Sequence, residues 1–274
     1  MYYRHDLDYV YPERSDEHMI TVNKKREIKY DEKYPYLKKG FFFAIARGVF
    51  FVLLHLIVFP LLRLVLGLRI EGRKNVRRNR KLFKNGMITV SNHVFMWDFL
   101  CVMRAIHPRL AHFPAWKENL DGNLRWLIRW AGGIPIPTES FRAMAKCNRA
   151  MEEVLEKGKV LHFFPEGSMW FYYPDIRPFK LAVFKYAVKY DKPVLPISLS
   201  FRPRRGLYKL FGKSPCVDMH IGEPILIDKT LSPIAAAEDL RARAYHVIQG
   251  MNGIQPGDPT YNTDHNIDSY QKTM

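Results

Sequence analysis

The feature that most limits the possible folds is an alternation of short apolar runs with longer helical patterns from residue 86 onward. Strand-like runs fall at 87–90, 110–115, 133–136, 159–164, 193–199 and 216–221. Helical candidates lie between them at 97–107, 120–131, 140–157 and 179–190. Strands that alternate with helices are typical of α/β domains. We therefore expect one main domain, residues 70–253, with a mixed central sheet flanked by helices.

Two helices in this pattern have clear boundary signals. The segment from Ser140 carries apolar residues at helical spacing and closes at Gly158. The last helix has Ser232 as its N-cap, Pro233 in its first turn and Gly250 directly after it. Proline near a helix start and glycine beyond its end are common boundary residues. The remaining residues, 254–274, are polar, and we expect them to form a C-terminal tail.

The chain before residue 70 divides into two segments. Residues 1–40 form an N-terminal extension that contains seven tyrosines. So many aromatic side chains argue against a wholly solvated segment, and we expect part of it to lie against the domain. Residues 41–69 form an apolar helical segment, which is the most hydrophobic part of the chain.

The apolar segment predicts an association with membranes. Its cleanest window, Gly48 to Leu62, would extend about 22 Å as a helix, which is shorter than the roughly 30 Å of a hydrocarbon core. A run of basic residues begins at its end: Arg63, Arg69, Arg73, Lys74, Arg77, Arg78, Arg80, Lys81 and Lys84. Anionic lipid headgroups attract an apolar helix with basic ends. We interpret residues 41–69 as a monotopic anchor. A core helix beside a solvated basic loop and a single membrane span remain alternatives.

The formal net charge of +16 predicts an anionic partner. The basic run adjoins an apolar helix and the chain has no aromatic-basic nucleic-acid motif, so a membrane surface is favoured over nucleic acid. The N-terminus carries no signal-peptide core, and the three cysteines, Cys101, Cys147 and Cys216, lack the spacing of a metal site or a disulfide framework. We therefore expect the cytoplasmic face of the cell membrane and no metal.

Two polar loops follow two of the strand-like runs. His93 and Asp98 come directly after the run 87–90, and Glu166 and Gly167 follow the run 159–164. An imidazole steadied by a carboxylate is the usual arrangement of a general base and its orienting residue. Taken alone, this spacing is weak evidence, because chance supplies roughly half an occurrence in a chain with this many histidines and aspartates. Satisfied surface or core residues remain the plain alternative.

The order of four sequence blocks is more specific. Asn92-His93 through Asp98 comes first, then Gly132 to Pro137, then Phe164-Pro165-Glu166-Gly167, then Val194-Leu195-Pro196-Ile197. Together these blocks resemble those of the glycerolipid acyltransferase family, whose type member is the 1-acylglycerol-3-phosphate acyltransferase. The resemblance covers roughly residues 70 to 230 and includes the segments around Lys117 and Lys180.

The resemblance implies an O-acyltransferase of phospholipid biosynthesis. It would transfer a fatty acyl group from acyl-CoA or acyl carrier protein to a hydroxyl of a lysophospholipid, without a cofactor. His93 would be the general base and Asp98 its partner. The resemblance places Glu166, Gly167, Ser168 and Pro137 in the acceptor site, with backbone N–H groups near the second block facing the oxyanion.

The chain departs from the family pattern at two arginines that help bind the acceptor phosphate. Thr138 and Met169 occupy their positions. Neither side chain replaces a bidentate guanidinium, which argues against a phosphate-monoester acceptor unless Lys117, Arg177 and Lys180 compensate. A phosphate-free acceptor such as an amino-acid-derived lipid is therefore an alternative, and so is a catalytically inactive membrane-binding protein.

Overall fold

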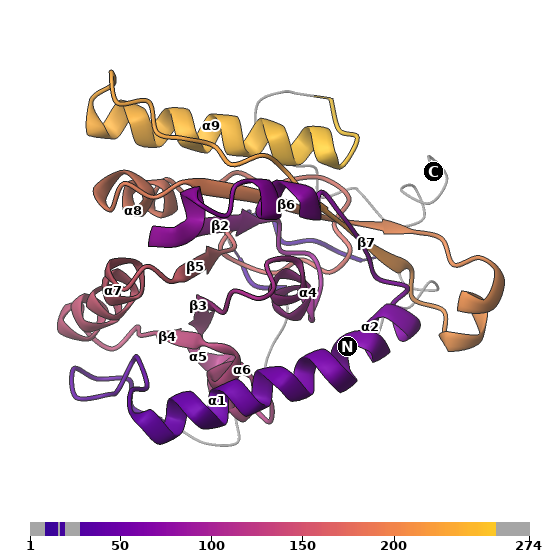
Figure 1. The fold of residues 1–274 in the computed structure, drawn as a ribbon, viewed down its shortest axis with the longest axis horizontal. Helices are drawn as coiled ribbons and strands as arrows, with labels where there is room; N and C mark the ends of the chain where they lie inside the picture. Colours follow the sequence, from indigo (N-terminus) through magenta and orange to yellow (C-terminus); the bar gives the residue numbers. More distant parts are fainter. Residues whose placement is uncertain (1–8, 16, 20–27, 256–274) are drawn as a thin grey trace.

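A mixed sheet with helices on both faces forms the body of the molecule (Figure 1). The structure is a computed structural model that describes residues 9–15, 17–19 and 28–255. Within them the strand order is β1-β7-β6-β2-β5-β3-β4, and all neighbours are parallel except β6 and β7. The strands are β1 (Arg69–Glu71), β2 (Met87–Ser91), β3 (Ala111–Trp116), β4 (Gly133–Ile136), β5 (Val160–Phe163), β6 (Val194–Arg202) and β7 (Cys216–Ile221). The expected mixed α/β architecture is confirmed.

The helices of the domain are α3 (Arg73–Arg78), α4 (Asp98–Ala105), α5 (Lys117–Asp121), α6 (Arg125–Ala131), α7 (Phe141–Glu156), α8 (Ala182–Lys189) and α9 (Pro233–Met251), with 3₁₀ turns η2 (Leu82–Asn85) and η3 (Gly206–Phe211). Three details differ from the sequence-based expectation. The helix expected at 120–131 is broken in two by extended backbone at Gly122. Helix α9 continues through Gly250. Strand β1 was not expected, because its three residues lie inside the basic run.

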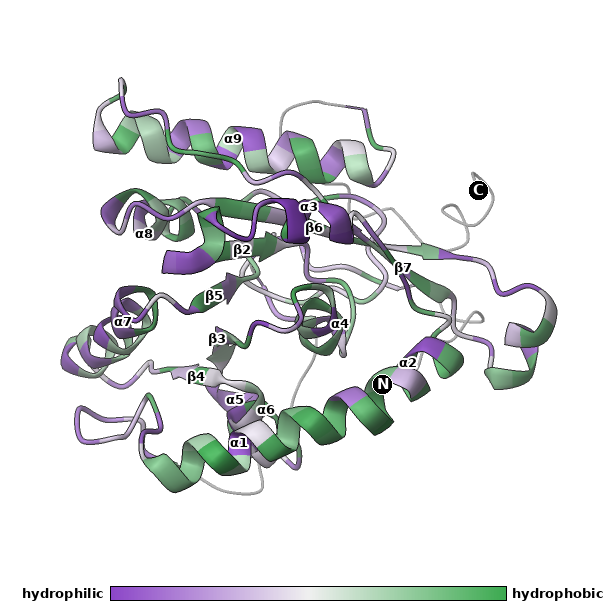
Figure 2. Cartoon of the chain, viewed as in Figure 1, coloured by the Kyte–Doolittle hydropathy of each residue, from purple (hydrophilic) through white to green (hydrophobic). Residues whose placement is uncertain are grey.

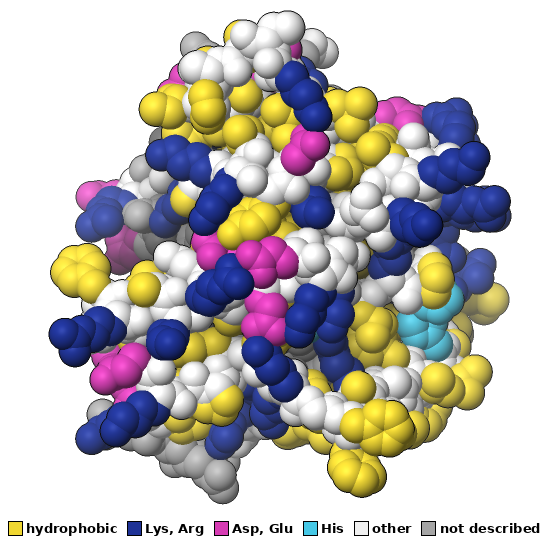
Figure 3. All heavy atoms as spheres, turned by 60° about the vertical axis from the view of Figure 1, so that its left-hand side comes forward, with side chains coloured by type: hydrophobic (Ala, Val, Ile, Leu, Met, Phe, Trp, Pro, Cys, Tyr) yellow, Lys and Arg dark blue, Asp and Glu magenta, His cyan; other side chains and the backbone are white. Residues whose placement is uncertain are grey.

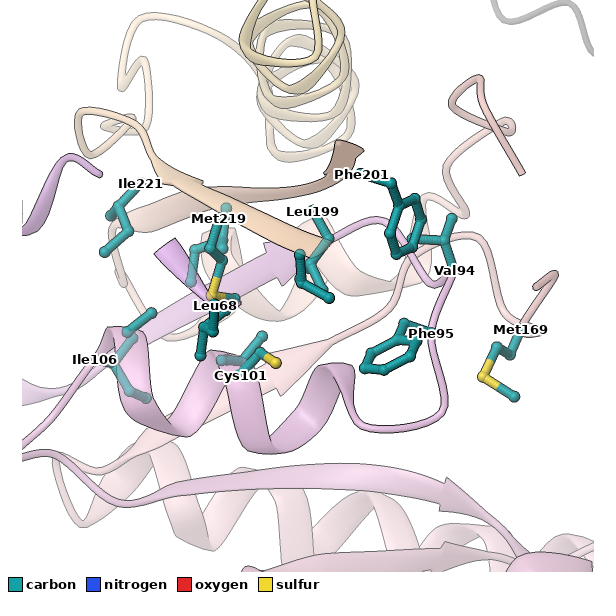
Figure 4. Close-up of a cluster of buried hydrophobic side chains, with 14 of the residues drawn as sticks. Leu68, Val94, Phe95, Cys101, Ile106, Met169, Leu199, Phe201, Met219 and Ile221 are labelled. Atoms are coloured by element: carbon teal, nitrogen blue, oxygen red, sulfur yellow. The ribbon is translucent and has the colours of Figure 1, made fainter. Parts of the chain in front are cut away.

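The alternation of side chains along the strands separates two hydrophobic clusters. Ile88 and Val90 of β2 pack with α7, α8 and α9 on one face. Met87 packs on the other face in a cluster that includes Cys101 of α4 and Leu199 of β6 (Figure 4). The sheet is thus buried on both faces, and the loops at the carboxyl ends of its parallel strands are held in fixed positions.

A long apolar helix runs along the lower edge of the domain in Figures 1 and 2. It comprises α1 (Phe41–Leu53), a wider π-helical turn η1 (Leu54–Val58) and α2 (Phe59–Val65). Arg47 does not interrupt it, because this side chain turns inward and donates to the carbonyls of Ala111, Trp130 and Ala131.

The helix of 25 residues is long and apolar enough to cross a membrane, and it is the one helix in the described part of the chain that meets this criterion. The expectation from the sequence underestimated the length of this helix, because it counted only the uninterrupted apolar window from Gly48 to Leu62. One side of the helix, with Arg47, Phe51, Leu54 and Phe59, is buried against the domain. The outer side exposes large apolar side chains: Phe41, Phe42, Ile45, Val49, Val52, Leu53, Leu56, Ile57, Leu61 and Leu64.

Candidate active site

The loop after β2 is fixed by an asparagine that extends the sheet. The Asn92 side chain donates to the Leu199 carbonyl at 2.8 Å and accepts from the Leu199 N–H at 2.8 Å. A primary amide can pair in this way because it carries both a donor and an acceptor. Asn92 therefore continues the pairing of β2 with β6 beyond Ser91 and sets the backbone from which His93 projects.

His93 and Asp98 form a direct pair at the start of α4. The Nδ1 atom of His93 lies 2.5 Å from Oδ2 of Asp98. Asp98 is buried, and this burial raises the pKa of its carboxyl group, whereas the imidazole and the backbone N–H groups of Phe95 and Phe99 act in the opposite direction. The carboxylate also benefits from its place in the first turn of the helix. Because Asp98 engages Nδ1, Nε2 is the nitrogen of His93 that remains for proton transfer.

The rings of Phe164 and His162 pack beside His93. The Phe164 ring stacks on His93 with a centroid distance of 3.9 Å and an interplanar angle of 15°. The His162 ring packs against the Phe164 ring in an edge-to-face arrangement. Nδ1 of His162 lies 2.9 Å from the Thr89 hydroxyl. Complete burial and the charge of His93 lower the pKa of His162 to about 3. His162 is therefore neutral and packs beneath His93 and Asp98.

Glu166 lies inside the protein beneath His93. Its Oε2 accepts hydrogen bonds from the His93 N–H and from Nη2 of Arg177, both at 2.9 Å, and its Oε1 accepts from the Arg177 N–H at 2.9 Å. Only 1% of Glu166 is exposed. This geometry ties the two loops together, and it conflicts with the expectation that the Glu166 carboxylate contacts the acceptor headgroup.

Arg177 is fully buried and held by protein groups, so its expected role as a phosphate ligand conflicts with the structure. Its guanidinium donates to the Ser168 hydroxyl at 2.8 Å, to the Ser168 carbonyl at 2.5 Å and to the Ser15 carbonyl at 2.7 Å. It also lies 4.4 Å from the Trp170 ring centroid. The sequence showed a cation near the third block but could not show that the cation points inward.

The remaining predicted acceptor residues lie in the segments that follow β3, β4 and β5. Gly167 is exposed with a φ of 89°, and a Cβ atom there would approach Nζ of Lys180 to 2.8 Å, so this glycine allows the lysine to lie close to the loop. Lys117 pairs with Glu139 at 3.0 Å. Pro137 is buried, and Thr138 follows it at the surface. Of the three cations expected to compensate for the missing arginines, Lys117 and Lys180 stay candidates.

An N-terminal segment, residues 9–19 except the undescribed residue 16, crosses this site. Arg177 holds the Ser15 carbonyl, and the Trp170 indole N–H donates to the Glu17 carbonyl at 2.9 Å. The His18 ring stacks on Trp116 with a centroid distance of 3.8 Å and an interplanar angle of 9°. Burial and the charge of His93 lower the pKa of His18. Sequence reasoning missed His18, because no local motif connects the extension with the site.

The aromatic run after the third block belongs to the core. Trp170, Tyr172 and Tyr173 are buried, and the backbone N–H groups of Trp170 and Tyr172 donate to the carbonyls of His93 and Val94. Tyr11 of the N-terminal segment packs on Trp170 and Tyr173. The run therefore supports the loop that carries His93 from inside the protein. Among the described residues, no group of three or more His, Cys, Asp or Glu side chains is placed to hold a metal ion.

The chain is similar to known proteins over part of its length. Residues 67–200, just under half of the chain, match the family model described as Acyltransferase, and this match supports a PlsC-like acyltransferase family. This range contains His93, Asp98, Glu166 and Arg177. The N-terminal segment and helix α1 lie outside it.

Particular relatives are 1-acyl-sn-glycerol-3-phosphate acyltransferases. That of Neisseria gonorrhoeae is 31% identical over 123 residues, which are 44% of this chain and 47% of the relative. The chloroplastic enzyme BAT2 of Brassica napus is 34% identical over 76 residues, 27% of this chain and 21% of the relative. The matches thus span less than half of the relatives' length. The crystal structure of the 1-acyl-sn-glycerophosphate (LPA) acyltransferase PlsC from Thermotoga maritima aligns with a TM-score of 0.49 and 24% identity, covering 68% of this chain and 70% of that one.

Proposed function

We propose that the protein is a membrane-associated O-acyltransferase that transfers a fatty acyl group from acyl-CoA or acyl carrier protein to a hydroxyl of a lysophospholipid. The observation that carries this proposal is the hydrogen bond between His93 and Asp98 at the carboxyl end of β2, inside the matched acyltransferase region. The pair orients one ring nitrogen, fixes its tautomer and directs the other nitrogen to the acceptor hydroxyl.

The reaction needs one proton to move twice. Nε2 of His93 accepts the hydroxyl proton as the acceptor oxygen attacks the thioester carbonyl, and the buried Asp98 carboxylate stabilises the imidazolium that results. The tetrahedral intermediate then collapses, the C–S bond breaks and the imidazolium returns the proton to the departing thiolate. The products are an ester and a free thiol. No covalent enzyme intermediate is required.

The position of Lys180 supports an acceptor with a negatively charged headgroup. Its ammonium lies against Gly167, next to the loop that carries Glu166. The burial of Arg177, together with Thr138 and Met169 at the arginine positions of the family, favours a second candidate acceptor without a phosphate monoester, such as an amino-acid-derived lipid. The two candidates share the chemistry at His93 and differ in the headgroup.

Membrane attachment would use the outer side of α1 and α2. Arg47 binds this helix to the domain along its inner side, which favours a helix lying in the membrane interface over one that crosses the bilayer. The turn η3 packs near α2 and exposes Leu207 and Leu210, which are 78% and 80% accessible. Three exposed cations flank these leucines: Arg205, Lys209 and Lys213. Attachment would be to the anionic inner leaflet, on the cytoplasmic face.

The test is lipid mass spectrometry with the purified full chain on vesicles that contain phosphatidylglycerol. Labelled acyl-CoA and acyl carrier protein are supplied with a panel of lysophosphatidate, other lysophospholipids and phosphate-free lysolipids. We expect a new ester with at least one acceptor, no transfer by His93→Ala, and normal transfer by His220→Ala, a half-buried histidine on β7. Absence of any acylated product, or near-normal turnover by His93→Ala, would contradict the proposal.

A further inference from the structure

A second cluster of buried cations lies beneath helix α1, away from the catalytic pair. Arg47 and Arg129 are both more than nine-tenths buried, and the buried His112 of β3 contacts Arg47. The strand register places His112 level with Leu161 and Ile88. This level is three residues, or about 10 Å, before the end of β2, and His93 lies beyond that end. The cluster is therefore a separate location.

The hydrogen bonds fix the proton on His112. Its Nε2 lies 2.9 Å from Nη1 of Arg47. A guanidinium can only donate, so Nε2 must be the acceptor and Nδ1 must carry the proton of the neutral ring. Burial and the charge of Arg47 hold the pKa of His112 well below its usual value, which keeps the ring neutral. The Nδ1–H group is buried and has no partner among the described residues.

The arginines also retain unused donors. Arg129 donates to the carbonyls of Tyr36, Gly133 and Pro35, and its Nε is buried without a partner among the described residues. Arg47 makes four of the five hydrogen bonds that a guanidinium offers. Neither guanidinium forms an ion pair with a carboxylate in the described part of the chain. Buried cations are normally paired, because desolvation of an isolated charge is costly.

The residues that carry these donors line a cavity of about 10 Å³, which has room for one acceptor atom. Arg47, His112, Arg129 and Lys38 are among its lining residues, and none of the described residues that line it is acidic. Lys38 is exposed, so the cavity adjoins the surface. Hydrogen-bond donors on cationic side chains, without a protein acceptor in the cavity, are suited to bind an oxygen atom that carries negative charge.

We propose that this cavity binds one oxygen of a phosphate group. Two sources supply that chemistry: inorganic phosphate, and the headgroup of an anionic lipid. The lipid source agrees with the surroundings, because Phe41 and Phe42 begin helix α1 only three residues after Lys38 and are 74% and 83% exposed. A headgroup at the cavity would leave its acyl chains beside the apolar outer side of α1. Figure 3 shows Lys and Arg side chains spread over one face of the molecule and a group of hydrophobic side chains at its lower right, at the height of α1 in Figure 1.

The experiment compares two neighbouring exposed lysines in the full-length protein. Lys38→Gln changes a residue of the cavity, whereas Lys39→Gln changes a lysine that instead pairs with Glu153. Thermal unfolding is followed at constant ionic strength in two arms. One arm titrates sodium phosphate against sodium chloride with the protein in neutral detergent. The other compares vesicles of phosphatidylglycerol in phosphatidylcholine with vesicles of phosphatidylcholine alone.

A ligand that binds the folded state raises the unfolding temperature. We expect the wild type and Lys39→Gln to be stabilised in at least one arm, and the apparent Kd to be about fivefold weaker in Lys38→Gln, the effect of one cation near a phosphate. A response in the phosphate arm alone identifies a free anion, and a response specific to phosphatidylglycerol identifies a lipid headgroup. Equal responses of the two lysine variants, or no response of the wild type in either arm, would overturn the proposal. The readout does not involve turnover, so the His93→Ala variant should respond like the wild type even if the proposed acyl transfer is wrong.

Discussion

Two ends of the same sheet handle buried positive charge in opposite ways. At the carboxyl ends of β2 and β5, each basic group faces a carboxylate: His93 faces Asp98, and Arg177 faces Glu166. At the amino ends of β3 and β4, Arg47 and Arg129 bind backbone carbonyls instead. A carboxylate fixes both the charge and the direction of its partner, whereas carbonyls leave positive charge uncompensated. The first end is therefore suited to position groups for chemistry, and the second to attract an anion from outside.

The largest effect is expected at the carboxylate that orients the base. Asp98→Asn keeps the shape of the side chain but lets the amide accommodate the wrong tautomer of His93. We expect kcat to fall on the order of 10³-fold while KM for the acceptor changes little, because the loss concerns proton transfer. Steady-state kinetics with the acceptor identified by mass spectrometry provide the measurement. A rise in KM with unchanged kcat would show instead that Asp98 contributes to binding.

The same substitution at the two arginines tests the comparison directly. Arg177→Met leaves the Glu166 carboxylate buried without its partner, and we expect a loss of about 3–5 kcal/mol in the free energy of unfolding. The loops that carry His93 and Glu166 should loosen together, so activity should also fall. Urea unfolding of the variant and the wild type measures the difference. A loss below about 1 kcal/mol would mean that the ion pair is not what holds the site.

The buried imidazole of His162, near the carboxyl end of β5, has hydrogen-bond partners that are neutral. His162 has the hydroxyls of Thr89 and Ser91 at its two nitrogens, and its pKa is lowered to about 3. The pKa of His162 is lower in the folded state than in the unfolded chain, so the unfolded state binds more protons between about pH 6.5 and pH 3. The contribution of the neutral His162 to the free energy of unfolding is therefore complete above pH 6.5 and is lost as the pH falls. Between pH 7 and 4.5 the loss is about 2–3 kcal/mol.

His162→Gln should remove this part of the acid sensitivity. The difference in unfolding free energy between the wild type and the variant should therefore decrease by about 2–3 kcal/mol between pH 7 and pH 4.5. Chemical unfolding at several pH values tests the slope, which does not depend on the hydrogen bonds that the variant loses at every pH. Parallel pH profiles for the two proteins would show that His162 is not the titrating group.

The smallest effect is expected at the other arginine. Arg47→Met removes a desolvated charge that has no carboxylate partner among the described residues, and this relief offsets part of the cost of leaving three carbonyls and Nε2 of His112 without a donor, so the expected loss in unfolding free energy is about 1–2 kcal/mol. The variant should also lose stabilisation by phosphate if the cavity binds that anion. Urea unfolding with and without phosphate covers both points. A destabilisation as large as that of Arg177→Met would erase the distinction between the two ends.

Much of the sheet and the proximity of His93 to Asp98 could be predicted from the sequence because their signals are local. Apolar runs of four to nine residues mark β2 to β7, and the spacing of His93 and Asp98 is short enough for one loop and one helical turn to join them. Strand β1 escaped prediction because only its pairing with β7 makes Arg69–Glu71 a strand. Such pairing depends on residues almost 150 positions away.

The direction of charged side chains could not be predicted in the same way. Arg47 reads in the sequence as an interruption of an apolar helix, yet it is the residue that attaches the inner side of that helix to the domain. Arg177 reads as an exposed cation, yet its partners come from residues 15, 166 and 168. The stacking of His18 on Trp116 has the same origin, since it joins segments almost 100 residues apart.

The π-helical turn at Leu54–Val58 has a consequence for how the long apolar helix can vary. Leu54 and Phe59 both face the domain although they are five residues apart, a spacing that would rotate a side chain by about 140° in an uninterrupted α-helix. The extra residue in the wide turn absorbs this rotation, so the segments before and after it keep the same side inward. Removing a single residue there would leave the average hydropathy almost unchanged. It would nevertheless rotate the exposed apolar side of α2 out of line with that of α1. Hydropathy profiles would not detect such a defect, because it concerns rotational phase and not composition.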